Sequence, residues 1–320
     1  MSKALQLYTR TLVVWVLLFG VVAYVFPAPF VALGAGMKWF FALTMFGIGV
    51  VLRPVDFKRV AEHPWIVLVG VCAQFTLMPL GAFAVGRLLG LPDVYALGLV
   101  VTGAAPGAMT SNVMSYVAKG DAAYSVSLTA VATLLCPVLT PGLIWLLAGA
   151  RMDVPFLGMF LDLLIMVVIP LLAGFGVRYF FYAQVEKTID VFPAISATFI
   201  VFICSVVIAN NHDKLPEITG AIVAADVLLN LYGLAGGYGV GALFRMAPRR
   251  RRTLAIEIGM QNAGLGVVLA TAHFSAETAL PAAFFVFLCI VTASLMSAYW
   301  QRGAGRRAGA AAKEGMNGAA

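Results

Sequence analysis

A stretch of small and polar residues at 257–264 interrupts a long apolar run in the second half of the chain. It begins with the carboxylate of Glu257, and Gln261 and Asn262 follow one helical turn later. Carboxylate and amide oxygens, together with the carbonyls of an unwound helix, are the ligands that hard cations prefer. A charge at membrane depth costs at least ~2.5 kcal/mol, so it needs a reason to be there. We expect Glu257 to bind Na+ or a proton, the alternative being a structural carboxylate paired with a neighbouring helix.

A similar interruption at 103–112 lies in the first half of the chain. It ends with Ser111 and Asn112, which supply a hydroxyl and an amide oxygen. Ser125 and Thr129 follow at a spacing of four residues, which places them on one face of a helix. Hydroxyls in membrane helices commonly bond the carbonyl of the preceding turn. Their spacing and their closeness to the interruption nevertheless favour a shared cation site.

Other polar side chains lie inside apolar runs, with two interpretations each. Gln74 precedes Pro79, which can free a carbonyl and bend the helix. Gln74 itself either binds a cation or joins two helices. Asp162 lies about one turn inside a predicted helix end, where it can reach water. Asp226 lies deeper, four residues before Asn230, and either lines a cavity or caps a helix contact.

The elements that hold these groups follow from composition. The chain has 320 residues, of which 62% are apolar and 11% charged, with a mean hydropathy of +0.97. Soluble domains carry about 25% charged residues, so this is a polytopic membrane protein. Its four cysteines fall in apolar runs without paired spacing and indicate neither disulfides nor a metal site. No nucleophile–base pair, phosphate loop or transition-metal spacing is present, so no enzymatic activity is expected.

Hydropathy predicts an all-α protein with ten transmembrane helices. At roughly 20 residues per span, the predicted limits are 11–30, 37–52, 64–88, 94–118, 124–149, 156–181, 190–209, 217–245, 252–272 and 279–301. With both termini in the cytoplasm, 17 of the 21 basic residues fall on the cytoplasmic side; Lys38, Arg87, Arg151 and Lys214 are the four outside. This asymmetry satisfies the positive-inside rule. It makes the Arg-rich stretch at 249–252 a cytoplasmic stop signal rather than a nucleic-acid site.

The two interruptions occupy equivalent places in two halves of five helices. An odd number of helices per half inserts the second half upside down relative to the first. The predicted organisation is a first repeat over 1–155, a second over 156–301, and a disordered cytoplasmic tail over 302–320. Buried unwound backbone survives in a membrane only inside protein or beside a water-filled cavity. A matched pair of interrupted helices indicates the binding site of a transporter.

At these residues the chain resembles the bile acid:sodium symporter family, in particular its compact ten-helix bacterial members. The resemblance extends from about residue 10 to Trp300. It is carried by Met45-Phe-Gly-Ile-Gly-Val with Asp56-Phe57, by 74–79, by Thr110-Ser-Asn-Val-Met-Ser-Tyr-Val-Ala-Lys-Gly and by Thr253-Leu-Ala-Ile-Glu-Ile-Gly-Met-Gln-Asn-Ala-Gly. It implies a panel domain of helices 1, 2, 6 and 7 and a core domain of helices 3–5 and 8–10. In the core, the discontinuous helices 4 and 9 cross.

The resemblance also implies two transported sodium ions and the residues that hold them. One site would use Ser111, Asn112, Ser125, Thr129 and Glu257. The other would use Gln74, Glu257, Gln261 and the carbonyls of Ile258 and Met260. The implied substrate residues are Met109, Thr110, Asn230, Asn262, Ala263, Ile290 and Ser294.

The substrate side departs from the family pattern. Met109 and Thr110 stand where the family usually has Thr and Ala. A usual His-Asn pair becomes Leu229-Asn230, and a usual Trp-His-Asn becomes Leu-Cys-Ile at 288–290. Three polar cavity groups are therefore apolar, so bile-acid specificity does not follow. Related bacterial proteins are associated with pantoate and other small carboxylates, and plant relatives with 2-oxo acids.

We therefore expect a sodium-coupled symporter of an organic anion that works by alternating access in a bacterial inner membrane. Its expected partners are the small anion and membrane lipids, with no nucleic acid and no obligate protein partner. A proton-coupled transporter or effluxer of related fold is the first alternative. The proton-coupled transporter would need an Asp pair in the interruptions, and the effluxer would need a thiol there. A channel or membrane sensor is the second, and it would need an open pore or a soluble signalling domain.

Overall fold

The computed structural model describes residues 11–55, 62, 64–149, 152–188, 191–213 and 215–317. The Asp56-Phe57 pair of the family pattern lies outside them. The described secondary structure is helical except for one isolated antiparallel bridge. The helices, in chain order, are α2 (Leu12–Val25), α3 (Pro27–Leu33), the short η1 (Gly34–Gly36), α4 (Met37–Val51), α6 (Pro64–Leu88), α7 (Asp93–Ala104), α8 (Thr110–Val117), α9 (Ala122–Ala148), α10 (Phe156–Leu163), the π-helical η2 (Leu164–Val168), α11 (Ile169–Phe180), α12 (Tyr182–Thr188), α13 (Phe192–Asn210), α14 (Leu215–Leu243), α15 (Pro248–Gly259), α16 (Ala263–His273) and α17 (Leu280–Asn317).

Six of these helical stretches are long and apolar enough to cross a membrane. They are Pro27–Val51, Pro64–Leu88, Ala122–Ala148, Phe156–Phe180, Gly220–Leu243 and Leu280–Gln301. Four shorter apolar helices accompany them, at Val14–Val25, Asp93–Ala104, Ala194–Asn210 and Ala263–His273. The architecture is that of a polytopic membrane protein.

The N-terminal helices differ from the predicted spans. The first predicted span, 11–30, ends in the structure at Val25, because Phe26 leaves the helical conformation and Pro27 begins a new helix. Proline suits the first position of a helix, where its missing N–H is not needed. The predicted loop between the first two spans is instead helical, as α3 and η1 lead directly into α4.

Both predicted interruptions are present, and both are shorter than the sequence indicates. The first divides a predicted span into α7 and α8, with 105–109 between them; the second divides another into α15 and α16, with 260–262 between them. Glu257 therefore lies in the last turn of α15 rather than in unwound chain. Ser111 and Asn112 lie in the first turn of α8.

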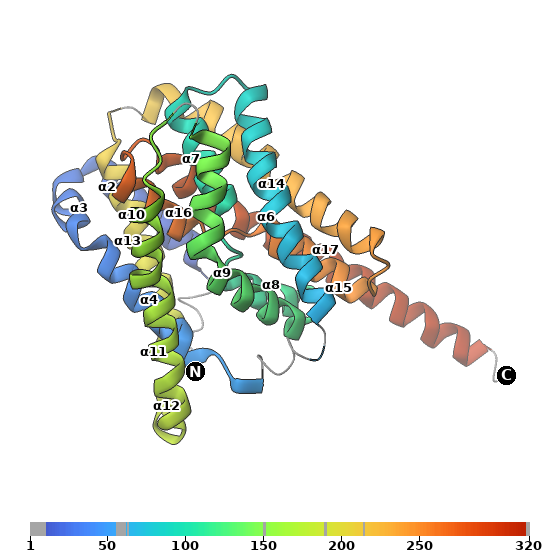
Figure 1. The fold of residues 1–320 in the computed structure, drawn as a ribbon. Helices are drawn as coiled ribbons and strands as arrows, with labels where there is room; N and C mark the ends of the chain where they lie inside the picture. Colours follow the sequence, from blue (N-terminus) through green and yellow to red (C-terminus); the bar gives the residue numbers. More distant parts are fainter. Residues whose placement is uncertain are drawn as a thin grey trace.

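The helices pack in two groups that meet along α16 and α17. One group contains α2, α4, α11 and α13, and the other contains α6, α7, α9, α14, α15 and α17. Figure 1 shows the first group on the left of the molecule and α6, α14, α15 and α17 on the right. α16 contacts α7 and α17 of the second group as well as α4, α10 and α13, and α17 contacts α2 and α13. These contacts place α16 between the two groups.

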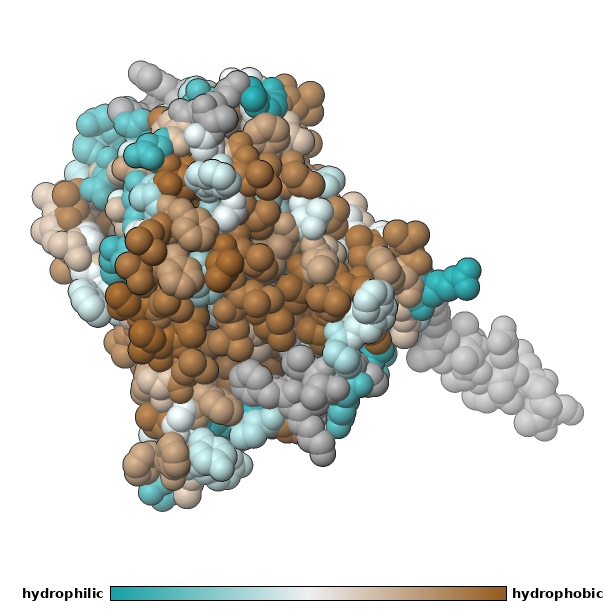
Figure 2. Space-filling model, viewed as in Figure 1, coloured by the Kyte–Doolittle hydropathy of each residue, from teal (hydrophilic) through white to brown (hydrophobic). Residues whose placement is uncertain are grey.

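The outer surface carries the apolar side chains that a bilayer requires. Figure 2 shows a broad hydrophobic area over the middle of the visible face, with hydrophilic residues gathered towards the ends. Exposed tryptophans lie at helix ends, as at Trp39 in α4, Trp65 in α6 and Trp145 in α9. Tryptophan is enriched at the two membrane–water interfaces, where its amphipathic ring is accommodated.

The last helix extends beyond its predicted span. α17 continues to Asn317, whereas the sequence predicts a disordered tail from residue 302. Five of the sixteen residues at 302–317 are alanine, the strongest helix former, and they favour the helix against four glycines.

Candidate functional site

The two unwound segments cross and hydrogen-bond to each other through their backbones. Gly107 and Gln261 form the isolated antiparallel bridge. The amide of Ala108 donates to the carbonyl of Met260 (2.8 Å), and the amide of Asn262 donates to the carbonyl of Pro106 (2.8 Å). Backbone that leaves a helix at membrane depth must find partners within the protein. Here each interruption supplies the partners of the other.

Four helix ends meet at this crossing. α7 and α15 end there with their carbonyl ends, and α8 and α16 begin there with their amide ends. The carbonyl ends carry partial negative charge and the amide ends partial positive charge. Asn262 caps α16, its side-chain oxygen accepting from the amide of Leu265 at 3.2 Å. The crossing thus offers a cation and an anion separate places at close range.

The Glu257 carboxylate is buried beside the crossing and accepts three hydroxyl hydrogen bonds. Ser111 donates to its Oε2 at 2.6 Å and Ser125 donates to the same atom at 2.7 Å, while Thr129 donates to Oε1. Thr129 also lies 3.3 Å from the amide oxygen of Asn112. The structure therefore brings together all five residues of the first implied site, drawn from α8, α9 and α15.

Three residues of the second implied site, Gln74, Gln261 and Ile258, form a connected group. Gln74 of α6 donates to the side-chain oxygen of Gln261 (2.7 Å) and lies 3.2 Å from the carbonyl of Ala105. Gln261 in turn donates to the carbonyl of Ile258 at 2.7 Å. The side-chain oxygen of Gln74 is buried without a partner among the described residues. Met260 differs from this group, because its carbonyl accepts from Ala108 in the bridge between the segments.

The seven implied substrate residues do not share one environment. Met109, Thr110, Asn262, Ile290 and Ser294 are at least partly exposed near the start of α8 and on α17. Asn230 and Ala263, in contrast, are buried. The Asn230 amide donates to the carbonyl of Gly259 at 2.8 Å and so supports the end of α15. Five of the seven are thus accessible from outside the protein, whereas Asn230 contacts the end of α15 from within.

Comparison with known proteins shows the family of this chain. The family described as "Sodium Bile acid symporter family" matches residues 39–218, which is more than half of the chain. The chain belongs to this family. Its membership confirms the resemblance carried by the interrupted helices.

The relatives include bacterial, plant and animal proteins. A Bacillus subtilis protein named "Uncharacterized sodium-dependent transporter YocS" is 39% identical over 293 residues, covering 92% of this chain and 91% of its own length. The Arabidopsis thaliana protein named "Probable sodium/metabolite cotransporter BASS1, chloroplastic" is 35% identical over 82% of this chain and 66% of its own length. The human "Sodium/bile acid cotransporter 4" is 29% identical over 70% of this chain and 52% of its own length. These relatives are sodium-dependent membrane transporters and not enzymes.

Two residues of the site have no signal in the side-chain chemistry of the sequence. Gly107 lies so close to Glu257 that a Cβ built on it would be 2.7 Å from Oε1. Thr140 of α9 donates to the carbonyl of Ala104, the last residue of α7, at 2.7 Å. A glycine within an interruption and a threonine between two prolines, Pro137 and Pro141, mark these positions only weakly.

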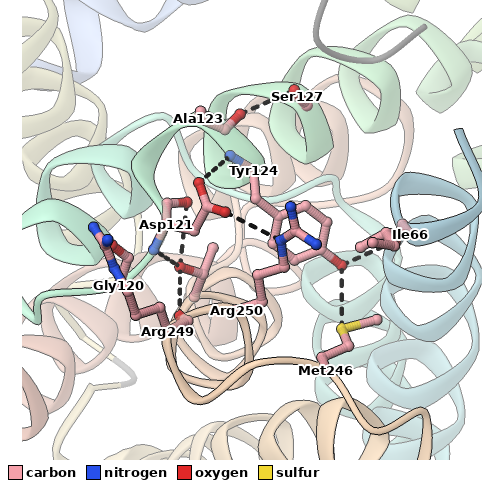
Figure 3. Close-up of polar contacts among 10 residues, drawn as sticks. Ile66, Gly120, Asp121, Ala123, Tyr124, Ser127, Met246, Arg249 and Arg250 are labelled. Atoms are coloured by element: carbon pink, nitrogen blue, oxygen red, sulfur yellow. Dashed lines mark hydrogen bonds and ion pairs between the residues drawn. The ribbon is translucent and has the colours of Figure 1, made fainter. Parts of the chain in front are cut away.

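The basic stretch 249–252 makes structural contacts as well as carrying positive charge. Arg250 pairs with Asp121 (3.1 Å), and Arg249 donates to the carbonyl of Gly120 at 3.2 Å. Asp121 also caps α9, and its amide donates to Thr253 at 2.8 Å. Figure 3 shows these contacts joining the start of α15 to the turn before α9. The charged residues hold the half-helix that carries Glu257 against the helix that carries Ser125 and Thr129.

Asp162 has two partners across the helix groups. Its Oδ2 lies 2.5 Å from Nζ of Lys38 in α4 and 2.8 Å from Nε2 of His273 at the end of α16. Asp162 is therefore not simply exposed to water, and it ties α10 to both α4 and α16.

Proposed function

We propose that this protein is a symporter that couples the entry of Na+ to the uptake of a small organic anion. The observation that supports it most is the buried Glu257 carboxylate, surrounded by three hydroxyls and an amide beside the crossed helix ends. A buried carboxylate is stable when a cation compensates its charge. Oxygen ligands from carboxylate, hydroxyl and amide groups suit a hard cation.

The proposed first sodium ion occupies the place beside Glu257 at which the hydrogens of the three hydroxyl groups now point. The three hydroxyls can rotate so that their oxygens face the ion, because a hydroxyl is both donor and acceptor. The proposed second ion lies among Gln74, Gln261 and the carbonyl of Ile258, where the unpaired Gln74 oxygen is already available. Glu257 contributes its charge to both ions, as the family pattern implies.

The proposed anion binds beside the starts of α8 and α16. The positive ends of these two helices favour negative charge there, and Thr110 and Asn262 add polar groups at the same place. Two sodium ions and one glutamate leave a net charge of +1, which one carboxylate neutralises. Met109 and Ile290 make the proposed anion site more apolar than the family norm, which fits a monoanion with an apolar part. A pantoate-like acid, a 2-oxo acid and a bile-acid-like anion are the candidates.

Alternating access follows from the two groups of helices in this proposal. The group of α2, α4, α11 and α13 corresponds to the implied panel, and the group around α6, α9, α14, α15 and α17 to the implied core. Relative motion of the two would expose the crossing to opposite sides of the membrane in turn. The proposed orientation places both termini in the cytoplasm, as the basic residues predict.

Sodium-dependent thermal stabilisation of the purified protein tests the sodium assignment. Wild type should gain stability as NaCl replaces choline chloride, and Glu257→Ala should remain folded but lose this gain. Asp153→Asn is the matched control, because Asp153 is exposed in the loop before α10. Full sodium-dependent stabilisation of Glu257→Ala would refute the assignment.

Uptake into proteoliposomes tests the coupling. Carboxylates that stabilise the protein only with Na+ present should be taken up in response to an inward sodium gradient, with net positive charge moving inwards. Uptake that follows a pH gradient without sodium would instead favour the proton-coupled alternative.

A further inference from the structure

A cavity of about 440 Å3 lies between α2, α13, α14 and α17, where the two groups of helices meet. Aliphatic and aromatic side chains form most of its wall, among them Ile208 and Phe284. Asp226 of α14 is the only acidic or basic side chain among the described residues that line it. Cavities of this size hold small organic molecules, and a few polar groups in them decide which molecule binds. In this cavity the carboxyl group of Asp226 is the group that determines which ligand binds.

Asp226 lies buried without a hydrogen-bond partner in the part of the chain that the structure describes. Its exposed fraction is 1%, and neither carboxyl oxygen has a hydrogen-bond partner among the residues that the structure describes. An ionised carboxylate accepts hydrogen bonds at both oxygens, and burying it without any is strongly unfavourable. Ionisable residues inside membrane segments are therefore uncommon and mark functional positions. Both oxygens of Asp226 are therefore available to a partner from outside the chain.

The mouth of the cavity faces the apolar side of the molecule rather than the sodium site. Its rim is formed by exposed side chains of α2 and α14: Leu17 is 53% exposed, Val21 62%, Tyr24 44% and Val223 37%. Val223 belongs to a stretch long enough to cross a membrane, Gly220–Leu243, and the other three belong to the shorter apolar helix Val14–Val25. A ligand reaches the cavity from the bilayer, so it must itself be soluble in the bilayer.

We propose that this cavity binds a lipophilic organic ammonium. Its N–H groups would donate to the two oxygens of Asp226, and its apolar body would fill the space between α2 and α17. A metal ion fits less well, because no group of three His, Cys, Asp or Glu side chains gathers in the part of the chain that the structure describes. An ammonium needs only the one carboxylate, and the apolar wall strengthens their attraction by excluding water.

Occupancy of the cavity has a consequence for transport. The cavity is lined by both α2 and α13 of one group and α14 and α17 of the other. A ligand that fills it joins surfaces that must slide past each other during alternating access. The ammonium therefore acts as an inhibitor from the membrane side, at a place separate from the sodium and anion sites.

Three probes with one apolar body test the proposal. Wild-type protein in phosphatidylcholine nanodiscs is titrated at neutral pH with 1-adamantylmethylammonium, 1-adamantylmethanol and 1-adamantanecarboxylate, and the dissociation constants are obtained from thermal-stability shifts. The ammonium should bind at least about tenfold more tightly than the alcohol, and the carboxylate most weakly, since a paired charge is worth this much in a water-poor site. In Asp226→Asn the ammonium and the alcohol should bind equally well.

Variants at the mouth provide a test that leaves the carboxylate in place. Val223→Trp narrows the mouth and should weaken both the ammonium and the alcohol. Leu228→Trp is the matched control, since Leu228 is 41% exposed on the same helix but does not line the cavity. Sodium-dependent stabilisation should persist in all three variants, which shows that they are folded and separates this proposal from the proposed symport. Equal or tighter binding of the alcohol or the carboxylate, or no binding of the ammonium to wild type, overturns the proposal.

Discussion

At Gly107 the absence of a side chain decides how closely the two interruptions can approach each other. A Cβ at this position would lie 2.7 Å from Oε1 of Glu257, closer than a methyl group and an oxygen can approach. Gly107→Ala should therefore displace the carboxylate and weaken sodium binding at least tenfold, which corresponds to about 1.4 kcal/mol. Sodium titrations followed by thermal stability measure the change. Gly142→Ala in α9 is the control, because its Cβ would meet only Phe156 at an ordinary 3.9 Å.

Two serines on α9 allow a hydroxyl of the proposed sodium site to be compared with a hydroxyl that has only a structural role. Ser125 donates to Glu257, whereas Ser127 is equally buried and donates to the carbonyl of Ala123 in its own helix. Ser125→Ala should lower sodium affinity by about 1–3 kcal/mol, since it removes a polar oxygen that faces the ion in the proposed site. Ser127→Ala should leave sodium affinity unchanged. Equal losses in the two variants would indicate a general packing defect of α9.

The types of residue in the sequence predict the contacts of the first implied cation site better than those of the implied substrate residues. The first implied site consists largely of polar groups at membrane depth: Glu257, Ser111, Ser125 and Thr129. Because such groups are unfavourable in an apolar environment unless they have polar partners, their presence predicts that they contact one another. Asn230 satisfies the same criterion but supports the backbone of α15, because an amide can serve either purpose. Gly107 lacks any group that sequence reasoning could detect; only the distance to Glu257 reveals its role.

Helix ends define the site at the scale of elements, and Thr140 secures one of them. Its hydroxyl donates to the carbonyl of Ala104, the last residue of α7, at 2.7 Å. Thr140→Val keeps the shape and leaves this buried carbonyl unsatisfied, at a cost of about 1–3 kcal/mol. The thermal unfolding midpoint should fall accordingly. Thr44→Val is the comparison, since Thr44 bonds a carbonyl within its own helix; a similar fall there would contradict the capping role.

The existence of the interrupted helices could be predicted, but their limits could not. Glycines and polar residues mark where a helix is weak, and they extend over 257–264, yet the chain leaves the helix only at 260–262. The surrounding protein decides how many of these residues unwind. At the N-terminus, Pro27 ends the first helix within an unbroken apolar run, where hydropathy alone continues the span to residue 30.

For the whole molecule, hydropathy predicts the number of apolar segments better than the way they pack. The chain shows no long-range signal for the association of Lys38, Asp162 and His273, because three residues far apart in sequence meet only through the arrangement of α4, α10 and α16. Their contact connects α16, which begins at the crossing, with α4 and α10. Separation of these three side chains would require α4, α10 and α16 to move relative to one another, so it depends on the whole molecule and not on any one helix.

Crosslinking α10 to α16 tests the relative motion that alternating access requires. Gly158 and His273 pack against each other across these helices, since a Cβ on Gly158 would lie 3.4 Å from the His273 ring. In a background in which the four native cysteines are replaced, Gly158→Cys and His273→Cys joined by a short, reducible bis-methanethiosulfonate should stop sodium-driven uptake. Reduction should restore uptake, and each single cysteine treated with the same reagent should stay active. The crosslinked protein should still be stabilised by Na+, because Glu257 and its hydroxyl partners lie at the other end of α16. Unchanged uptake by protein shown by mass spectrometry to be fully crosslinked would rule out movement between α10 and α16 during transport.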